Sequence, residues 1–354
     1  MNKNYYIIAG EASGDLHGAM LIERLKAQDK DAQIRFWGGD AMARAAGHNP
    51  VRHYADTAVM GFTEVIAKAG RIVGNLNFCK KDIAKANPDE VILIDYPGFN
   101  LKIARFAKRK GYKVTYYIPP KVWARGEHRI EQLKKYVDKV YIIFPFEKEY
   151  FKSHGIDAEY VRNPLIDKIN STPQETVGKG GKTIALFAGS RKAELKFLMP
   201  RLVQMEKLIR ADERYKDYEL IIAGAPSLKK SDYEKYLPRD NKIEIVFGKP
   251  YSLLRQSDAA IVCSGTASLE AAFCRTPQVV CYGFSKLTFA LAKHLVKVKY
   301  ISLANLTLDK LIFKELIQDA ASPEAMKSEL DRLVFDENVR ETMQKDYDLM
   351  LKRF

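Results

Sequence analysis

The sequence predicts an α/β protein built from two doubly wound, Rossmann-like domains, each with a parallel sheet. Short apolar runs alternate with amphipathic helical patterns through both halves of the 354-residue chain. A polar stretch at residues 163–182, rich in glycine and lysine, separates the halves. Alternation of strands and helices is typical of parallel sheets that are covered on both faces, and two such domains would face each other across a cleft.

The predicted strands are short apolar runs bounded by polar or turn-forming residues. In the first half they are residues 5–9, 34–37, 91–94, 114–118, 139–144 and 159–161. In the second half they are residues 183–187, 220–223, 243–247, 259–262 and 279–282. We therefore expect an N-terminal domain at residues 1–165 and a C-terminal domain at residues 166–322. The charged helical tail at residues 323–354 is expected to pack back on the N-terminal domain.

The composition narrows the class of partner. A net charge of +14 favours an anionic partner: nucleic acid, anionic lipid or a phosphorylated substrate. The four cysteines form no C-x-x-C pair, so we expect no zinc site and a reducing cytoplasm. No signal peptide is visible, and no apolar run reaches the roughly 18 residues expected of a membrane span. Any contact with a membrane is expected to come from the surface.

The first strand leads into a glycine-rich turn, which reads Ala-Gly-Glu-Ala-Ser-Gly-Asp-Leu-His-Gly-Ala at residues 9–19. Gly10, Gly14 and Gly18 do not have the G-x-G-x-x-G spacing of a dinucleotide loop. Glu11 and Asp15 would also repel a pyrophosphate. The turn is therefore predicted to serve something other than phosphate binding.

One phosphate-binding turn is predicted in the second half, where residues 261–270 read Ile-Val-Cys-Ser-Gly-Thr-Ala-Ser-Leu-Glu. A buried strand ends, and Ser264, Gly265 and Thr266 then open a helix. Hydroxyls and backbone N–H groups at a helix N-terminus can bind phosphate. Glu270, one helical turn further on, could hold a ribose. The alternative is a plain N-cap followed by an acid four residues later.

A second turn of this kind is predicted at residues 187–194, Phe-Ala-Gly-Ser-Arg-Lys-Ala-Glu. Ser190 lies in the turn, and Arg191 and Lys192 lie at its mouth. An arginine can stabilise a departing diphosphate, whose charge grows as its bond to the sugar breaks. The alternative is a solvated basic turn.

A candidate general base ends the apolar run in Ile-Leu-Ile-Asp-Tyr-Pro-Gly-Phe-Asn at residues 92–100. Partial desolvation of Asp95 is expected to raise its pKa toward that of a useful base. The alternative is that Asp95 caps the helix expected from about residue 101. Pro97 and Gly98 stand between Asp95 and that helix, which favours the chemical role.

Two basic stretches suit an anionic interface. Residues 102–113 hold six basic residues and no acid, and residues 284–300 interleave lysines with large apolar residues. Such segments can lie at lipid headgroups, although an ordinary amphipathic helix with a basic face is the alternative.

The sequence does not favour a metal-bound nucleotide sugar. The D-x-D motif occurs only at residues 29–31 and 346–348, in polar helical or helix-end stretches and not after a strand. We therefore expect no metal ion, and we expect no other cofactor.

Taken in order along nearly the whole chain, these segments resemble the lipid-A-disaccharide synthases, GT-B glycosyltransferases of lipid A biosynthesis. The resemblance rests on an ordered set of motifs: residues 9–15 and 94–100 quoted above, Val-Met-Gly-Phe-Thr-Glu-Val at 59–65, Val-Trp-Ala at 122–124, Phe-Pro-Phe-Glu at 144–147, Gly-Ser-Arg at 189–191, Ser-Gly-Thr-Ala-Ser-Leu-Glu-Ala at 264–271 and Tyr-Ile-Ser-Leu-Ala-Asn at 300–305.

The resemblance implies an inverting transfer from UDP-2,3-diacylglucosamine to 2,3-diacylglucosamine 1-phosphate (lipid X), which gives the β-1,6 lipid A disaccharide 1-phosphate and UDP. It also implies a role for each matching residue. Asp95 is the base; Glu11, Ser13 and Asn305 lie in the acceptor-side cleft; and Ser190, Arg191, Ser264, Gly265, Thr266 and Glu270 bind the UDP-sugar. The enzyme would work at the inner face of the inner membrane, on an anionic lipid surface, and the resemblance allows a homodimer.

The chain departs from the family pattern at Pro119, Arg125 and Arg162, which bears on activity rather than on fold, and Pro119 and Arg162 are expected near the cleft. One alternative is a related GT-B enzyme that acts on another lipid-linked or UDP-sugar substrate. The other is a basic α/β protein that binds nucleic acid. Only the net charge favours it, and no recognised nucleic-acid module supports it, so we expect no nucleic-acid partner.

Overall fold

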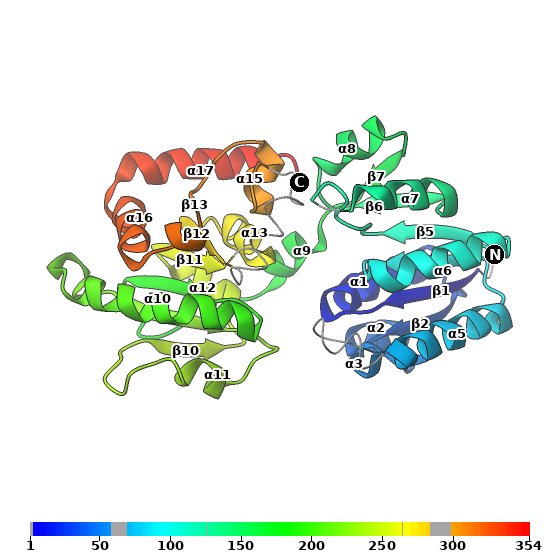
Figure 1. Ribbon diagram of the computed structural model, residues 1–354, viewed down its shortest axis with the longest axis horizontal. Helices are drawn as coiled ribbons and strands as arrows, with labels where there is room; N and C mark the ends of the chain where they lie inside the picture. The colour runs from blue at the N-terminus through cyan, green and yellow to red at the C-terminus, as the bar shows by residue number, and fades with distance from the viewer. Residues whose placement is uncertain (1–2, 58–68, 125, 264, 284–298) are drawn as a thin grey trace. The chain divides into compact units, whose positions relative to one another are not determined.

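The computed structural model describes residues 3–57, 69–124, 126–263, 265–283 and 299–354 (Figure 1). The chain divides into two compact units, Met1–Pro164 and Leu165–Phe354. The motif at residues 59–65, Arg125, Ser264 and residues 284–298 of the second basic stretch lie outside the described residues.

The first unit contains a sheet in which all paired strands run parallel. Among the described residues the sheet has seven strands in the order β3-β2-β1-β4-β5-β6-β7. They are β1 Asn4–Ala9, β2 Gln33–Gly38, β3 Arg52–His53, β4 Glu90–Ile94, β5 Lys113–Tyr117, β6 Lys139–Ile142 and β7 Ala158–Tyr160. The strand order reverses between β1 and β4. In open parallel sheets, ligands bind beside the carboxyl ends of the strands at such a switch point.

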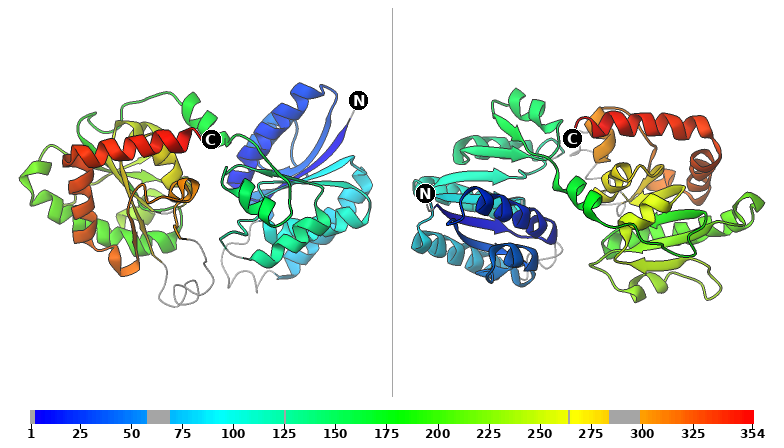
Figure 2. Two further views of the ribbon diagram at one scale, coloured as in Figure 1. Left: turned by 90° about the horizontal axis from the view of Figure 1, so that it is seen from above. Right: turned by 180° about the vertical axis from the view of Figure 1, so that it is seen from behind.

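Helices cover both faces of this sheet (Figure 2). They are α1 Ala12–Gln28, α2 Asp40–Ala46, α3 Tyr54–Thr57, α5 Ala69–Ala86, α6 Pro97–Arg109, α7 Ile130–Tyr136 and α8 Glu147–Ser153. Apolar residues of α5, α6, α7 and α8 form one core with buried strand residues such as Tyr6, Leu93 and Tyr116. Burial on both faces explains why the strands read as nearly continuous apolar runs.

The second unit has the same architecture. Its sheet is parallel and, among the described residues, has six strands in the order β10-β9-β8-β11-β12-β13. They are β8 Thr183–Phe187, β9 Glu219–Gly224, β10 Glu244–Phe247, β11 Ala259–Cys263, β12 Gln278–Tyr282 and β13 Glu315–Ile317. The flanking helices are α9 Pro164–Ser171, α10 Lys192–Arg210, α11 Lys230–Glu234, α12 Pro250–Gln256, α13 Thr266–Phe273, α15 Leu303–Leu308, α16 Pro323–Phe335 and α17 Glu337–Leu351. The strand order reverses between β8 and β11, which places a switch point there too.

The predicted fold class is confirmed: two parallel sheets, each flanked by helices. Every strand predicted from the sequence is present, with ends that differ by a few residues. Two edge strands were not predicted, β3 and β13. They are two and three residues long, too short for an apolar run to mark them.

The two C-terminal helices pack on the sheet and helices of the second unit, and the expected packing of residues 323–354 on the N-terminal domain stays a prediction. Ser322 and Asp336 cap α16 and α17 by accepting hydrogen bonds from Ala325 N–H and Val339 N–H. Helix α16 then contacts α10, β11 and β12. The buried Tyr347 hydroxyl of α17 donates to the Thr276 carbonyl, at 3.0 Å. Buried apolar residues on the inner faces of both helices decide the packing.

In the part of the chain that the structure describes, no helix combines the length and the apolar character needed to cross a bilayer.

Candidate active-site residues

Asp95 follows β4 directly, at the carboxyl end of the first unit's sheet beside the switch point. Its side chain is half-buried. Burial raises the pKa of this carboxyl above its ordinary value, and the negative charge of Glu11 raises it further, while the Lys121 ammonium lowers it. A carboxyl whose pKa is raised in this way is a better general base than a solvated aspartate.

Asp95 does not cap the following helix, because α6 begins at Pro97 and its N-cap is Tyr96. The helix begins earlier than the predicted residue 101. Proline is favoured in the first turn of a helix because its missing N–H has no intrahelical partner there. Pro97 and Gly98 therefore form the helix start instead of separating the helix from Asp95.

The backbone at the end of β4 is strained. Asp95 and Tyr96 have φ values of +45° and +49°, and Ile118, at the end of the neighbouring β5, has +63°. Residues other than glycine rarely adopt such left-handed backbone angles, which cost roughly 1–2 kcal/mol per residue. Strain of this kind persists only where the surroundings hold it, and it gathers at functional sites.

Glu11 and Ser13 lie where the first turn enters α1, beside Asp95. Glu11 is the N-cap of α1, makes no capping hydrogen bond with its side chain and is exposed, as is Ser13. Ala9 pairs with Ile94, so the residues that follow both strands emerge at the same edge of the sheet. The exposed Glu11 and Ser13 side chains are free to meet a ligand there.

The glycines of this turn serve packing. A Cβ on Gly10 would lie 2.4 Å from carbons of the Tyr96 ring, and a Cβ on Gly18 would lie 2.4 Å from the Met42 sulfur. Asp15 is buried, and its carboxylate accepts hydrogen bonds from the backbone N–H groups of Gly39, Ala41 and Met42 at 2.6, 3.0 and 3.1 Å. Asp15 thus caps α2 from α1, a role that the sequence did not indicate.

The first unit holds another buried carboxyl, that of Glu147. Glu147 opens α8 and accepts a hydrogen bond from Trp123 Nε1 at 2.8 Å, and burial raises its pKa to about 7. The hydrogen bond between Trp123 and Glu147 joins the two predicted motifs at residues 122–124 and 144–147.

Two of the departures from the family pattern lie among the described residues. Pro119 is buried at the end of β5, and Arg162 is exposed beyond β7.

In the second unit, Ser190 and Arg191 lie at the start of α10, as predicted, and both are exposed. Their backbone N–H groups donate to the Glu194 carboxylate at 2.8 and 3.2 Å. A Cβ on Gly189, whose φ is +110°, would collide with that carboxylate. Glu194 therefore occupies the position where the sequence suggested a phosphate. The Arg191 guanidinium is exposed, although its Nη1 also donates to Glu194 Oε1 at 3.3 Å.

The other predicted turn is arranged differently. Gly265 is the N-cap of α13 with a φ of +142°, and no side chain caps the helix. Among the described residues, the N–H groups of Gly265, Thr266 and Ala267 meet no acceptor. Glu270 is half-buried, accepts a hydrogen bond from the Tyr251 hydroxyl at 3.4 Å, and has a pKa raised by burial.

Asn305 is fully buried in the second unit, and its amide is saturated. The Nδ2 group donates to the Phe313 carbonyl and to Glu315 Oε1, at 3.1 and 2.9 Å. The Oδ1 atom accepts from Ile312 N–H and Phe313 N–H, at 2.9 and 3.4 Å. All hydrogen-bonding positions of the amide are used, so Asn305 holds the loop before β13 and has none left for an acceptor substrate.

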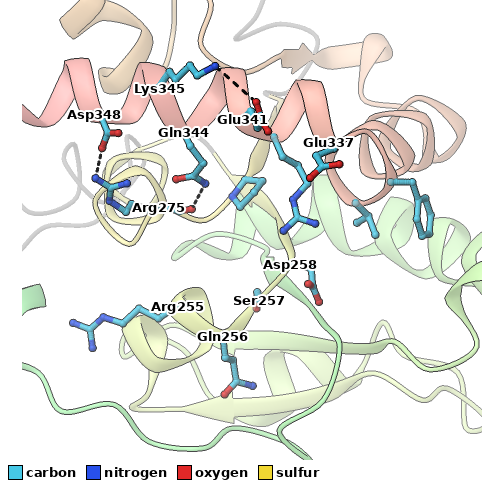
Figure 3. Close-up of a pocket in the computed structure, with 14 residues that line it drawn as sticks. Arg255, Gln256, Ser257, Asp258, Arg275, Glu337, Glu341, Gln344, Lys345 and Asp348 are labelled. Atoms are coloured by element: carbon cyan, nitrogen blue, oxygen red, sulfur yellow. Dashed lines mark hydrogen bonds and ion pairs between the residues drawn. The ribbon is translucent and has the colours of Figure 1, made fainter.

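A hollow of about 890 Å³ opens between α17 and the loop that precedes β11 (Figure 3). Its walls include Ser257, Asp258 and Gln344, and none of the described residues predicted to form a site lines it. The hollow lies at the amino end of β11, whereas ligands of open parallel sheets bind at the carboxyl ends. It belongs to neither candidate site.

Known proteins resemble this chain along its whole length. A family model described as lipid-A-disaccharide synthetase matches residues 5–353. The lipid-A-disaccharide synthase of Geobacter metallireducens is 35% identical over 344 residues, which cover 95% of this chain and 88% of that protein. The corresponding enzyme of Syntrophus aciditrophicus is 35% identical over 355 residues, covering 98% and 92%.

Solved structures share the fold at low sequence identity. The UDP-GlcNAc 2-epimerase from Neisseria meningitidis bound to UDP-GlcNAc has a TM-score of 0.65 at 10% identity, and 99% of each chain is covered. The calicheamicin glycosyltransferase CalG4 has a TM-score of 0.62 at 14% identity, covering 99% of this chain and 95% of that one. The structural likeness and the whole-chain sequence match agree: the chain belongs to the lipid-A-disaccharide synthase family and is a hexosyltransferase with the two-domain GT-B fold.

Proposed function

We propose that the protein transfers 2,3-diacylglucosamine from its UDP conjugate to the 6-hydroxyl of 2,3-diacylglucosamine 1-phosphate (lipid X). The products are the β-1,6-linked disaccharide 1-phosphate and UDP, with inversion at the anomeric carbon. Family membership supports this pair of substrates. The structural observation that carries the mechanism is the half-buried Asp95 carboxyl, with a raised pKa, at the switch point of the first unit's sheet.

In this mechanism Asp95 takes the proton of the acceptor's 6-hydroxyl. The hydroxyl oxygen forms a bond to the anomeric carbon while the bond from that carbon to the UDP oxygen breaks. A single displacement of this kind inverts the configuration. The raised pKa of Asp95 favours proton transfer near neutral pH. Glu11 and Ser13 are proposed to bind sugar hydroxyls of the acceptor beside Asp95, on the first unit.

The donor is proposed to bind on the second unit, with its diphosphate at the start of α13. The N–H groups of Gly265 and Thr266 meet no acceptor among the described residues, and the positive end of the helix dipole favours an anion. In the α10 turn the Ser190 hydroxyl and the Arg191 guanidinium are proposed to bind the donor, because Glu194 already accepts the two backbone N–H groups. Ser264 is proposed to add its hydroxyl, and Glu270 is proposed to bind the ribose.

The reaction is proposed to need no metal ion, since the sequence has no D-x-D motif after a strand. Arg191 and the α13 N-terminus would then stabilise the charge that develops on departing UDP. Added EDTA is expected to leave turnover unchanged, and loss of turnover in EDTA that Mg²⁺ restores would refute this part of the proposal.

A peripheral site on an anionic membrane, at the inner face of the inner membrane, is proposed for the first unit. Exposed Lys102 and Arg105 lie on α6, and exposed Val73 and Phe78 lie on the neighbouring α5. Basic and apolar side chains together suit a lipid surface. Vesicles that contain phosphatidylglycerol should retain the protein at low salt, whereas neutral vesicles should not.

A homodimer is a further prediction, which light scattering in solution would test.

The decisive experiment for the reaction supplies both lipid substrates and measures UDP and disaccharide by mass spectrometry. We expect the two products in equal amounts, and neither when the acceptor is omitted. Release of UDP, or epimerisation of the donor, without acceptor would favour the related UDP-sugar enzyme instead. Tight binding of duplex DNA at physiological salt would favour the nucleic-acid alternative.

A further inference from the structure

Every backbone polar group of Asp95 is hydrogen-bonded. Its carbonyl oxygen accepts two hydrogen bonds, from Asn100 Nδ2 and from the Tyr116 hydroxyl, each at 2.8 Å. Its N–H donates to the carbonyls of Tyr117 and Ile118, at 3.3 and 3.2 Å. The residue that follows β4 is thus held by α6 on one side and by β5 on the other.

The two side chains that hold the carbonyl are themselves immobilised. Asn100 and Tyr116 are both fully buried, and Asn100 Nδ2 also donates to the Ile94 carbonyl at 3.1 Å. Burial raises the pKa of Tyr116 well above its ordinary value, so that its hydroxyl keeps the proton that it donates. Both donors therefore reach the Asp95 carbonyl from fixed positions.

These hydrogen bonds act where the backbone is strained. Asp95, Tyr96 and Ile118 all have positive φ values, and Ile118 is also an acceptor for the Asp95 N–H. A tyrosine or an isoleucine at such an angle would relax to an extended or helical conformation if nothing opposed it. Relaxation at Asp95 or Tyr96 would turn the Asp95 side chain, because the carboxyl direction follows from these backbone angles.

We propose that Asn100 and Tyr116 are positioning residues for Asp95: by binding its carbonyl they keep the strained turn in place and aim the carboxylate at the acceptor hydroxyl. This inference rests on the proposed role of Asp95 as the base. Both side chains are fully buried, so neither is proposed to touch substrate. Their effect is on the orientation and the burial of the carboxylate, which are the two properties that general-base catalysis requires.

Tyr116→Phe tests the proposal, since it removes one hydroxyl and keeps the ring. Tyr6→Phe is the matched control: Tyr6 is another fully buried tyrosine of the same sheet, and its hydroxyl binds Asp82 at 2.7 Å, away from Asp95. We expect Tyr116→Phe to lower kcat by about tenfold with little change in KM. We expect Tyr6→Phe to lower Tm and to leave kcat at the wild-type value.

The pH profile separates positioning from general stability. Glu11 and Lys121 are the charged groups that act on Asp95, and neither variant changes them. Release of the turn should expose the carboxylate to water, so the acid limb of kcat/KM should move to lower pH in Tyr116→Phe and stay in place in Tyr6→Phe. Asn100→Ser, whose side chain is too short to reach the Asp95 carbonyl, should repeat the Tyr116→Phe result and decides the matter if Tyr116→Phe does not fold.

Wild-type kcat and pH profile in both Tyr116→Phe and Asn100→Ser would overturn the positioning role, as would an equal loss of kcat in Tyr6→Phe. Asp95→Asn then distinguishes a failure of the positioning role from a failure of Asp95 as the base. If Asp95→Asn is inactive while the positioning variants are normal, only this inference is wrong. If Asp95→Asn is fully active, the proposed base is wrong, and the inference that rests on it is overturned too.

Discussion

Gly10→Ala is the most informative change in the first turn, because it tests whether that glycine serves packing rather than phosphate binding. The new Cβ would lie 2.4, 2.4 and 2.8 Å from three carbons of the Tyr96 ring, whereas carbon atoms in contact lie about 3.5–4.0 Å apart. One of these atoms is Cγ, which lies on the Cβ–Cγ axis, so rotation of the ring about that bond cannot relieve the overlap. The whole Tyr96 side chain must move, and Asp95 precedes it in the chain.

The expected loss of stability follows from this overlap. Overpacking of a buried position costs about 1–3 kcal/mol. For a unit of this size, 1 kcal/mol corresponds to roughly 2–4 °C in Tm, so a fall of about 2–12 °C is expected. A displacement of about 1 Å at a catalytic group can lower the rate by about a hundredfold. Differential scanning fluorimetry and UDP release measure the two effects.

Gly74→Ala is the matched control. Gly74 is exposed within α5, has an ordinary φ, and a Cβ there would meet nothing within 4 Å. Alanine should stabilise this helix by roughly 0.5–1 kcal/mol without any effect on turnover. Wild-type Tm and activity in Gly10→Ala, or equal behaviour of the two variants, would show that Gly10 does not serve packing against Tyr96.

Three further predictions concern charge. Arg191→Ala should lower kcat by about a hundredfold with the fold intact, because the guanidinium is exposed and is proposed to stabilise departing UDP; an unchanged kcat in stopped assays would remove it from the mechanism. Glu11→Gln removes a negative charge that disfavours ionised Asp95, so the acid limb of kcat/KM should move to lower pH, and Lys121→Met should move it to higher pH; pH–rate profiles with no shift, or with the opposite signs, would contradict the electrostatics. Asp15→Asn weakens three hydrogen bonds at the start of α2 and should lower the free energy of unfolding by about 1.5–3 kcal/mol, which urea unfolding would measure. An unchanged urea midpoint would contradict this role of Asp15.

The fold could be predicted from the sequence because burial on both faces leaves an unambiguous pattern. The predicted strands at residues 183–187 and 259–262 are apolar runs that end at small or polar residues. The structure begins β8 at residue 183 and β11 at residue 259, as predicted. Edge strands β3 and β13 escaped prediction, since each is short and exposes one side to solvent. Their pairing depends on the neighbouring strand rather than on their own composition.

The candidate site could be predicted only in part. The position of Asp95 after a buried strand is a local signal, and the structure places it at the switch point with a raised pKa. The cap that Glu194 supplies and the saturated amide of Asn305 depend on which atoms meet in space. Sequence spacing alone does not distinguish a free N–H group from one that a nearby carboxylate already binds.

The buried carboxyls show the same limit. Asp15 lies in the most distinctive motif of the chain, and its partners are backbone N–H groups more than twenty residues away. Glu147 binds the Trp123 indole across a similar separation. Long-range contacts of this kind require the folded chain before a role can be assigned.

The proposed role of Asp95 is that of the base in an inverting lipid glycosyl transfer. Turnover of Asp95→Asn with both lipid substrates, measured as disaccharide formed per enzyme, tests it most directly. Asp89→Asn is the control, because Asp89 is an exposed carboxyl just before the amino end of the same strand. A loss of about 10²–10⁴-fold is expected in Asp95→Asn, and near-normal turnover is expected in Asp89→Asn. Near-normal disaccharide formation by a correctly folded Asp95→Asn protein would contradict it.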